Sequence, residues 1–141
     1  MYILDTDHLS LLGRASSAEA VRLRSRLAEL KPEERVTTII TFEEQMRGWI
    51  SHLARLRPIV RQVEAYRRLK EFLDVYSKLA VLDFDEAAAA KFEDLQRLRL
   101  RIGTMDLKIA AIAVSRGATV LSRNLKDFGR VPGLKAEDWT R

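Results

Sequence analysis

The segment that most clearly indicates the architecture is TMDLKIAAIAVSRGATVL, residues 104–121. Residues 109–114 are apolar on nearly every side of a helix, which predicts a buried helix over Met105–Arg116 with Thr104 as its cap. Gly117 is the residue type that commonly ends a helix, and Thr119–Leu121 follows as a short β-type run. A buried helix that leads directly into a strand is typical of α/β proteins.

Strand-like and helix-like segments alternate over the rest of the chain in the same way. The other expected strands are Tyr2–Leu4, Val36–Ile40 and Val81–Phe84. The other expected helices are Ser17–Leu30, Phe42–Leu56, Ile59–Leu79 and Ala87–Leu100. Asp85 is the expected N-cap of the helix over Ala87–Leu100. Pro58 suits the first turn of the helix over Ile59–Leu79, which forms a helical hairpin with the helix before it. Because parallel strands need helical crossovers, the alternation predicts an α/β fold with a mostly parallel sheet of four or five short strands and helices on both faces.

Composition narrows the class of protein. Of 141 residues, 47% are hydrophobic and 32% charged, so we predict one globular domain over residues 1–141. The absence of cysteine excludes disulfides, thiolate metal sites and cysteine nucleophiles. No secretory signal pattern opens the chain and no apolar run approaches the roughly 20 residues of a membrane span, so we expect a cytoplasmic protein without membrane contact. The net charge of +5 favours polyanionic partners.

Acidic and amide side chains follow the expected strands or, in the case of Asp106, open the buried helix. They are Asp5 and Asp7, Glu43 and Glu44, Asp106, and Asn124 with Asp127. Taken singly, these acids have ordinary structural explanations. Asp5 and Asp7 could cap a turn that begins at His8, and Glu43, Glu44 and Asp106 could complement helix dipoles. Ligands of parallel sheets, however, gather beyond the carboxyl ends of the strands, where these side chains would converge.

Carboxylates that converge need a counterion. Two of them about 4 Å apart repel by about 4 kcal/mol at an effective dielectric constant of about 20. Protonation or an internal Arg or Lys could neutralise them, but oxygen ligands without cysteine match hard cations such as Mg²⁺ or Mn²⁺. Such an ion polarises a phosphoryl oxygen and activates water, so phosphodiester hydrolysis is the expected reaction. We interpret His8 and His52 as structural or exposed residues rather than general bases.

Four segments, residues 1–10, 41–48, 102–111 and 121–134, resemble in their order and spacing the PIN-domain ribonucleases, specifically the VapC-type toxins of bacterial toxin–antitoxin pairs. The resemblance covers nearly the whole chain and implies a three-layer PIN-like fold. It also implies a Mg²⁺- or Mn²⁺-dependent endoribonuclease that acts on RNA, forms a homodimer and binds a cognate antitoxin protein.

The resemblance also assigns site residues. The first metal-binding aspartate of the family matches Asp5, its glutamate four residues before Gly48 matches Glu44, and its aspartate before the Ile-Ala-Ala helix matches Asp106. At the fourth position, where many relatives have an acid, this chain has Asn124, with Asp127 three residues on. Asp7 replaces the asparagine common in the family and so adds an acid.

A basic segment, residues 47–70, could track RNA phosphates. Its candidate RNA-binding residues are Arg47, Arg55, Arg61, Arg67 and Arg68. The alternative is a solvated helix face whose long side chains cover apolar neighbours.

Two other functions fit parts of the sequence. Asp5-Thr6-Asp7 looks like the opening of an aspartyl-phosphate phosphatase, but Leu9 stands where that motif has Thr or Val. The missing acid at Asn124 is also compatible with a catalytically silent PIN-like domain that only binds RNA or protein.

Overall fold

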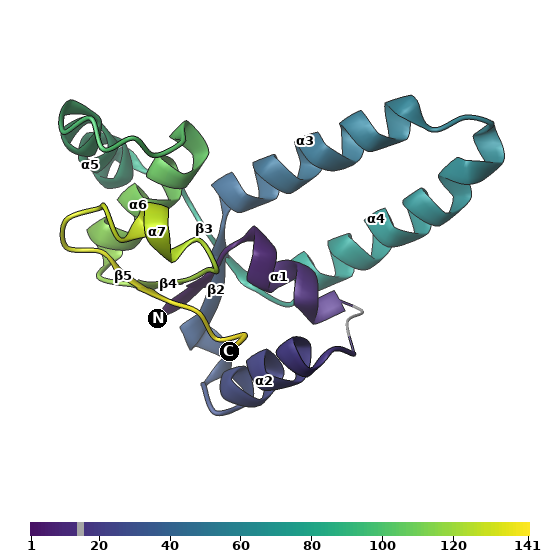
Figure 1. Ribbon diagram of the computed structural model, residues 1–141, viewed down its shortest axis with the longest axis horizontal. Helices are drawn as coiled ribbons and strands as arrows, with labels where there is room; N and C mark the ends of the chain where they lie inside the picture. The colour runs from purple at the N-terminus through teal and green to yellow at the C-terminus, as the bar shows by residue number, and fades with distance from the viewer. Residues whose placement is uncertain (14–15) are drawn as a thin grey trace.

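A parallel sheet forms the centre of the computed structural model, which describes residues 1–13 and 16–141 (Figure 1). Within these residues the sheet has five strands in the order β3-β2-β1-β4-β5, and every pairing is parallel. The strands are β1 Tyr2–Leu4, β2 Arg35–Thr38, β3 Ala80–Leu82, β4 Thr119–Leu121 and β5 Lys135–Glu137. The strands β2 and β3 lie on one side of β1 in the sheet, and the later strands β4 and β5 lie on the other side. The point where the strand order reverses therefore lies between β1 and β4.

Helices fill the connections between the strands. They are α1 Thr6–Gly13, α2 Ala18–Ala28, α3 Ile39–Arg55, α4 Gln62–Ser77, α5 Glu86–Arg97, α6 Thr104–Arg116 and α7 Leu125–Phe128, with 3₁₀ turns η1 Pro32–Glu34 and η2 Ile59–Arg61. Figure 1 shows α3 and α4 as the two arms of a long hairpin that extends away from the sheet. The predicted helical hairpin is thus confirmed.

The core is divided into two layers by the sheet. Ile3 and Val120 belong to a cluster with the buried side of α6, whereas their neighbours Leu4 and Leu121 belong to a second cluster with α1, α2 and α4. Consecutive strand residues point to opposite faces, so the same short strands supply both clusters. The fold is therefore the predicted α/β architecture, with helices on both faces of the sheet.

Several predicted boundaries were wrong by a few residues. The strand predicted over Val36–Ile40 ends at Thr38, because the Thr38 side chain accepts a hydrogen bond from the backbone N–H of Thr41 and so caps α3. The run predicted over Val81–Phe84 pairs as Ala80–Leu82. Two β-branched residues, Ile39 and Ile40, begin the helix instead of extending the strand.

Helix starts were also shifted in two places. Thr104 is the first residue of α6 rather than its cap, since the N-cap position is Gly103. Pro58 precedes the η2 turn, and α4 begins only at Gln62. Asp85, in contrast, caps α5 as predicted, with its carboxylate accepting from the N–H of Ala88 at 2.9 Å.

The sequence alone did not predict α1, α7 or β5. The strand β5 is the polar tripeptide Lys-Ala-Glu at the sheet edge, which carries none of the β-branched signal of the other strands. Within the described part of the chain, no helix is both long enough and apolar enough to cross a bilayer.

Two glycines make a matched stability test. Gly117 ends α6 at φ 65°, a left-handed conformation, whereas Gly48 lies inside α3 with open space where a Cβ would be. We expect Gly117→Ala to lower the free energy of unfolding by about 1 kcal/mol through backbone strain. Gly48→Ala should raise it by roughly 0.5 kcal/mol, because alanine favours the helix interior. Urea unfolding of both variants measures the difference, and two shifts of the same sign would contradict this account.

Candidate active site

Asp5 lies at the carboxyl end of β1, where the order of the strands reverses. Its backbone N–H donates to the carbonyl of Leu121 at 3.0 Å, so the residue is fixed between β1 and β4. Its side chain is 6% exposed, and Oδ2 accepts a hydrogen bond from Ser122 Oγ at 2.9 Å. The other oxygen, Oδ1, is buried and has no hydrogen-bond partner among the described residues. Such a group is costly to leave unpaired, so it marks a place that a ligand would satisfy.

The electrostatics of Asp5 agree with this geometry. Burial raises its pKa to about 6, and the negative charges of Asp7 and Asp106 act in the same direction, while the backbone N–H of Thr6 and the hydroxyl of Ser122 oppose them. Carboxylates from the start of the chain and from α6 are therefore close enough to repel one another.

Asp7, two residues away, has the opposite character. Its Oδ2 accepts from the N–H of Arg123 at 2.9 Å and lies 3.3 Å from Ser122 Oγ, while Oδ1 lies 2.7 Å from His8 Nδ1. Burial raises the pKa of Asp7, but hydrogen bonds from His8 and Arg123 outweigh it and the net pKa is lowered. The possible role of Asp7 as a cap for a turn at His8 was wrong, because α1 begins at Thr6 and the Asp7 side chain faces the loop after β4.

The structure distinguishes the neighbouring glutamates of α3. Glu44 Oε1 accepts a hydrogen bond from Thr6 Oγ1 at 2.7 Å, which places it beside the start of α1. Glu43 instead forms a 2.5 Å ion pair with Arg47 on the exposed side of the helix. Glu44 is thus the glutamate on the side of Asp5, and its assignment as an ion-binding residue stays a prediction.

A second group of side chains joins α6 to the loop after β4. Asn124 Nδ2 lies 3.3 Å from Asp106 Oδ2 and 3.0 Å from Asp127 Oδ2, so one amide contacts both acids. Burial raises the pKa of Asp106, and the charges of Glu44 and Asp127 raise it further. The Asn124 backbone N–H donates to Ser122 Oγ at 3.0 Å, which connects this group to Asp5.

These residues fit a hard divalent cation by their chemistry. Their side chains offer oxygen ligands, among them an Asp5 oxygen that has no hydrogen-bond partner among the described residues. The pKa values of Asp5 and Asp106 are raised by burial and by the charges of neighbouring acids. Across residues 1–13 and 16–141, no three His, Asp or Glu side chains lie close enough together to hold one ion in common.

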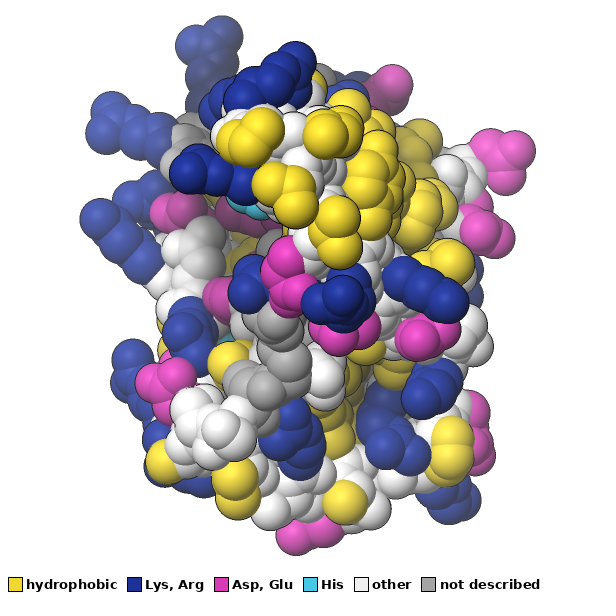
Figure 2. All heavy atoms as spheres, turned by 90° about the vertical axis from the view of Figure 1, so that its right-hand side faces the viewer, with side chains coloured by type: hydrophobic (Ala, Val, Ile, Leu, Met, Phe, Trp, Pro, Cys, Tyr) yellow, Lys and Arg dark blue, Asp and Glu magenta, His cyan; other side chains and the backbone are white. Residues whose placement is uncertain are grey.

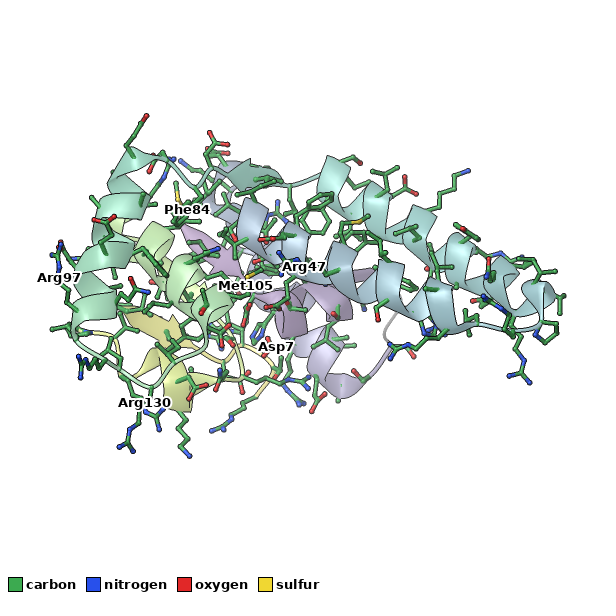
Figure 3. All side chains as sticks on the ribbon, turned by 90° about the horizontal axis from the view of Figure 1, so that it is seen from above. Asp7, Arg47, Phe84, Arg97, Met105 and Arg130 are labelled. Carbon is green, nitrogen blue, oxygen red and sulfur yellow. The ribbon has the colours of Figure 1, made fainter. Side chains whose placement is uncertain are left out.

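The predicted RNA-binding arginines occupy different parts of the hairpin. Arg67 and Arg68 both pair with Glu64, at 2.6 and 3.5 Å, and Arg47 pairs with Glu43. Arg55 and Arg61 are exposed near the far end of the hairpin. Figure 3 shows Arg47 in the same central region as Met105 and Asp7, where α3 packs against α6 and α1. Of the five, Arg47 therefore lies nearest to the acidic group, one helical turn from Glu44.

Three further residues of the site were not predicted from the sequence as site residues. Thr6 holds Glu44, Ser122 contacts both Asp5 and Asp7, and His8 contacts Asp7. Ser122 directly follows β4 and Thr6 is the second residue after β1, which is the signal that could have identified them. His8 was expected to be structural or exposed, and it is fully buried.

Comparison with known proteins identifies the family. Residues 2–134 match the PIN domain. The chain belongs to the PIN-domain family. It is 42% identical over 67 residues to the tRNA(fMet)-specific endonuclease VapC of Salmonella typhimurium, covering 45% of this chain and 51% of that protein. It is 31% identical over 94 residues to Ribonuclease VapC2 of Rickettsia felis, covering 63% of this chain and 70% of the relative.

A solved structure supports the same assignment. The DNA-bound VapBC structure from Salmonella typhimurium superimposes with a TM-score of 0.68 at 27% identity, over 98% of this chain and 97% of that chain. The predicted VapC-type PIN fold is therefore confirmed. The match spans about half the length of the Salmonella typhimurium relative.

The raised pKa of Asp5 predicts a specific dependence of stability on pH in metal-free buffer. The folded protein holds this proton more tightly than the unfolded chain, so Asp5 opposes folding as pH rises from 3.8 to about 6. We expect the free energy of unfolding of Asp5→Asn, minus that of the natural chain, to increase by up to about 3 kcal/mol between pH 4 and pH 7. Urea unfolding with a chelator at both pH values measures this double difference. A difference that does not change with pH would contradict the assigned pKa.

Proposed function

We propose that this PIN-domain protein is a Mg²⁺- or Mn²⁺-dependent endoribonuclease and the toxin of a toxin–antitoxin pair. The observation that carries the proposal is the buried oxygen of Asp5 that has no hydrogen-bond partner among the described residues, at the reversal point of the sheet and within electrostatic range of the raised-pKa carboxyl of Asp106. The VapC relatives are an endonuclease and a ribonuclease, which supports the same reaction here.

Each site residue has a distinct role in this proposal. Because no three acidic side chains of the described residues lie close enough to share one ion directly, Asp5, Glu44 and Asp106 would hold the divalent ion partly through its bound water. The ion would polarise the scissile phosphoryl oxygen and lower the pKa of that water. Thr6 orients Glu44 through its 2.7 Å hydrogen bond. Asn124 orients Asp106 by donating from its amide, and Asp127 assists by accepting from the same amide. Asp7, anchored by the N–H of Arg123, adds negative charge beside Asp5.

Protein partners are part of the proposal. We infer a cognate antitoxin, since the Salmonella typhimurium neighbour is a VapBC structure, and a homodimer. Figure 2, which faces the hairpin end, shows apolar side chains gathered at the surface among Lys and Arg. Exposed apolar residues of the hairpin include Ile50, Ile59, Val60, Val63, Tyr66 and Leu73. A continuous apolar surface of this kind is typical of a protein interaction site.

Substitution of the acids tests the nuclease. Asp5→Asn and Asp106→Asn should each lower the rate of RNA cleavage by more than about 100-fold, because each removes a charge that would hold the ion. Asp83→Asn, at an exposed acid after β3, is the matched control and should leave cleavage unchanged. Total RNA is incubated with each protein and Mn²⁺, with and without chelator, and new ends are mapped by sequencing.

Two results would reject this function. Undiminished Mn²⁺-dependent cleavage by Asp5→Asn would reject the site. A natural chain that binds RNA but gives no calorimetric signal with Mn²⁺ would favour the catalytically silent domain instead.

The hairpin arginines allow a second test, made in the Asp5→Asn background so that RNA stays intact. Arg47→Gln should weaken binding of single-stranded RNA and reduce the slope of log K against log salt concentration by about 0.7, the value for one lost phosphate contact. Arg61→Gln, near the far end of the hairpin, should change neither quantity. Fluorescence anisotropy at several salt concentrations measures both. An equal effect of the two substitutions would instead place RNA along the whole hairpin.

A further inference from the structure

We propose that His8 is a positioning residue that fixes Asp7 in place for the active site and connects the site to the C-terminal segment, residues 138–140. The inference rests on the proposed nuclease function. It assigns a role to a fully buried polar side chain that takes no part in binding the ion or the RNA.

The hydrogen bonds of His8 define which ring nitrogen carries the proton. The backbone N–H of Trp139 points at His8 Nε2 at 3.0 Å, and since an N–H can only donate, Nε2 must accept. Asp138 Oδ1 is 3.6 Å from Nε2, but it already accepts from the N–H and the hydroxyl of Thr140, at 2.9 and 2.6 Å. The proton is therefore on Nδ1, which donates to Asp7 Oδ1 at 2.7 Å.

This donation determines how Asp7 faces the site. With Oδ1 held by His8, Oδ2 is directed at the loop after β4, where it accepts from the N–H of Arg123 and approaches Ser122 Oγ. Ser122 has a single hydroxyl proton, and its 2.9 Å contact with Asp5 is shorter than its 3.3 Å contact with Asp7. Because Asp7 already accepts hydrogen bonds from His8 and Arg123, the Ser122 hydroxyl proton is available to Asp5. If His8 did not donate, Asp7 would compete with Asp5 for the Ser122 proton.

The C-terminal segment has anchors of its own. Trp139 packs against Tyr2 with ring centroids 4.7 Å apart, and the Arg26 guanidinium lies 4.4 Å from its ring centre. The carbonyl of Thr140 accepts from Arg22 Nε at 2.8 Å. These contacts do not involve His8, so a substitution of His8 can break one of its two hydrogen bonds without releasing the segment.

Two substitutions separate the two hydrogen bonds of His8. In His8→Asn the amide nitrogen takes the place of Nδ1, which keeps the donor to Asp7 and loses the acceptor for Trp139. In His8→Gln the amide oxygen takes the place of Nε2, which keeps the acceptor and loses the donor. We expect His8→Gln to lower kcat and weaken Mn²⁺ binding by roughly tenfold, as for other residues that orient ion-binding side chains. His8→Asn should show the larger fall in Tm and the smaller fall in kcat.

The experiment combines thermal unfolding, calorimetry of Mn²⁺ binding and RNA cleavage on the full chain, with the exposed His52→Gln as matched control. Activity that is lost in proportion to Tm in both variants would overturn the proposal in favour of a purely structural histidine, as would unchanged Mn²⁺ affinity in His8→Gln.

A spectroscopic measurement keeps the test independent of nuclease activity. The chain has only two histidines, so ¹⁵N-labelled imidazole spectra resolve His8 from His52. A proton on Nδ1 alone supports the positioning role, and a proton on Nε2 overturns it. A natural chain with this tautomer but without RNA cleavage would reject the proposed function while leaving the hydrogen-bond assignment intact.

Discussion

A carboxylate buried at the centre of a parallel sheet is the constraint on which the site depends. Asp5 is almost fully enclosed, one of its oxygens has no partner among the described residues, and its pKa is raised to about 6. A folded protein tolerates an uncompensated buried charge poorly. The surrounding structure supplies Ser122 as a donor to one oxygen and leaves the other open. An arrangement of this kind lowers stability and is retained where a ligand uses the free oxygen.

The sheet order explains why acids from distant parts of the sequence meet at this point. Because β1 is central and the chain adds strands first to one side and then to the other, the loops after β1 and β4 lie together with no strand between them. The starts of α1, α3 and α6 reach the same place. Environment then sets the character of each acid: Asp5 and Asp7 are two residues apart, yet burial raises one pKa while donors from His8 and Arg123 lower the other.

The sequence was sufficient for features that depend on local spacing. The buried helix α6, the cap at Asp85, the left-handed Gly117 and the acids after strands followed from short patterns. Features that depend on distant partners did not. His8 has its partner Trp139 131 residues away, and β5 becomes a strand by pairing with β4 rather than through its own composition. The choice of Glu44 over Glu43 came from the resemblance, and its physical basis, the Thr6 hydroxyl, is visible only in three dimensions.

The residues Asp7 and Asn124, at positions where the resemblance implies an asparagine and an acid, are complementary in physical terms. An aspartate at position 124 would face both Asp106 and Asp127 and would repel each by several kcal/mol at these distances, whereas the amide donates to both. An acid at position 7 is less destabilising, because hydrogen bonds from His8 Nδ1 and from the backbone N–H of Arg123 stabilise its negative charge. The negative charge at position 7 thus has two donors, and the amide at position 124 lies between two acids. This arrangement therefore preserves the attraction for a cation while reducing the repulsion around Asp106.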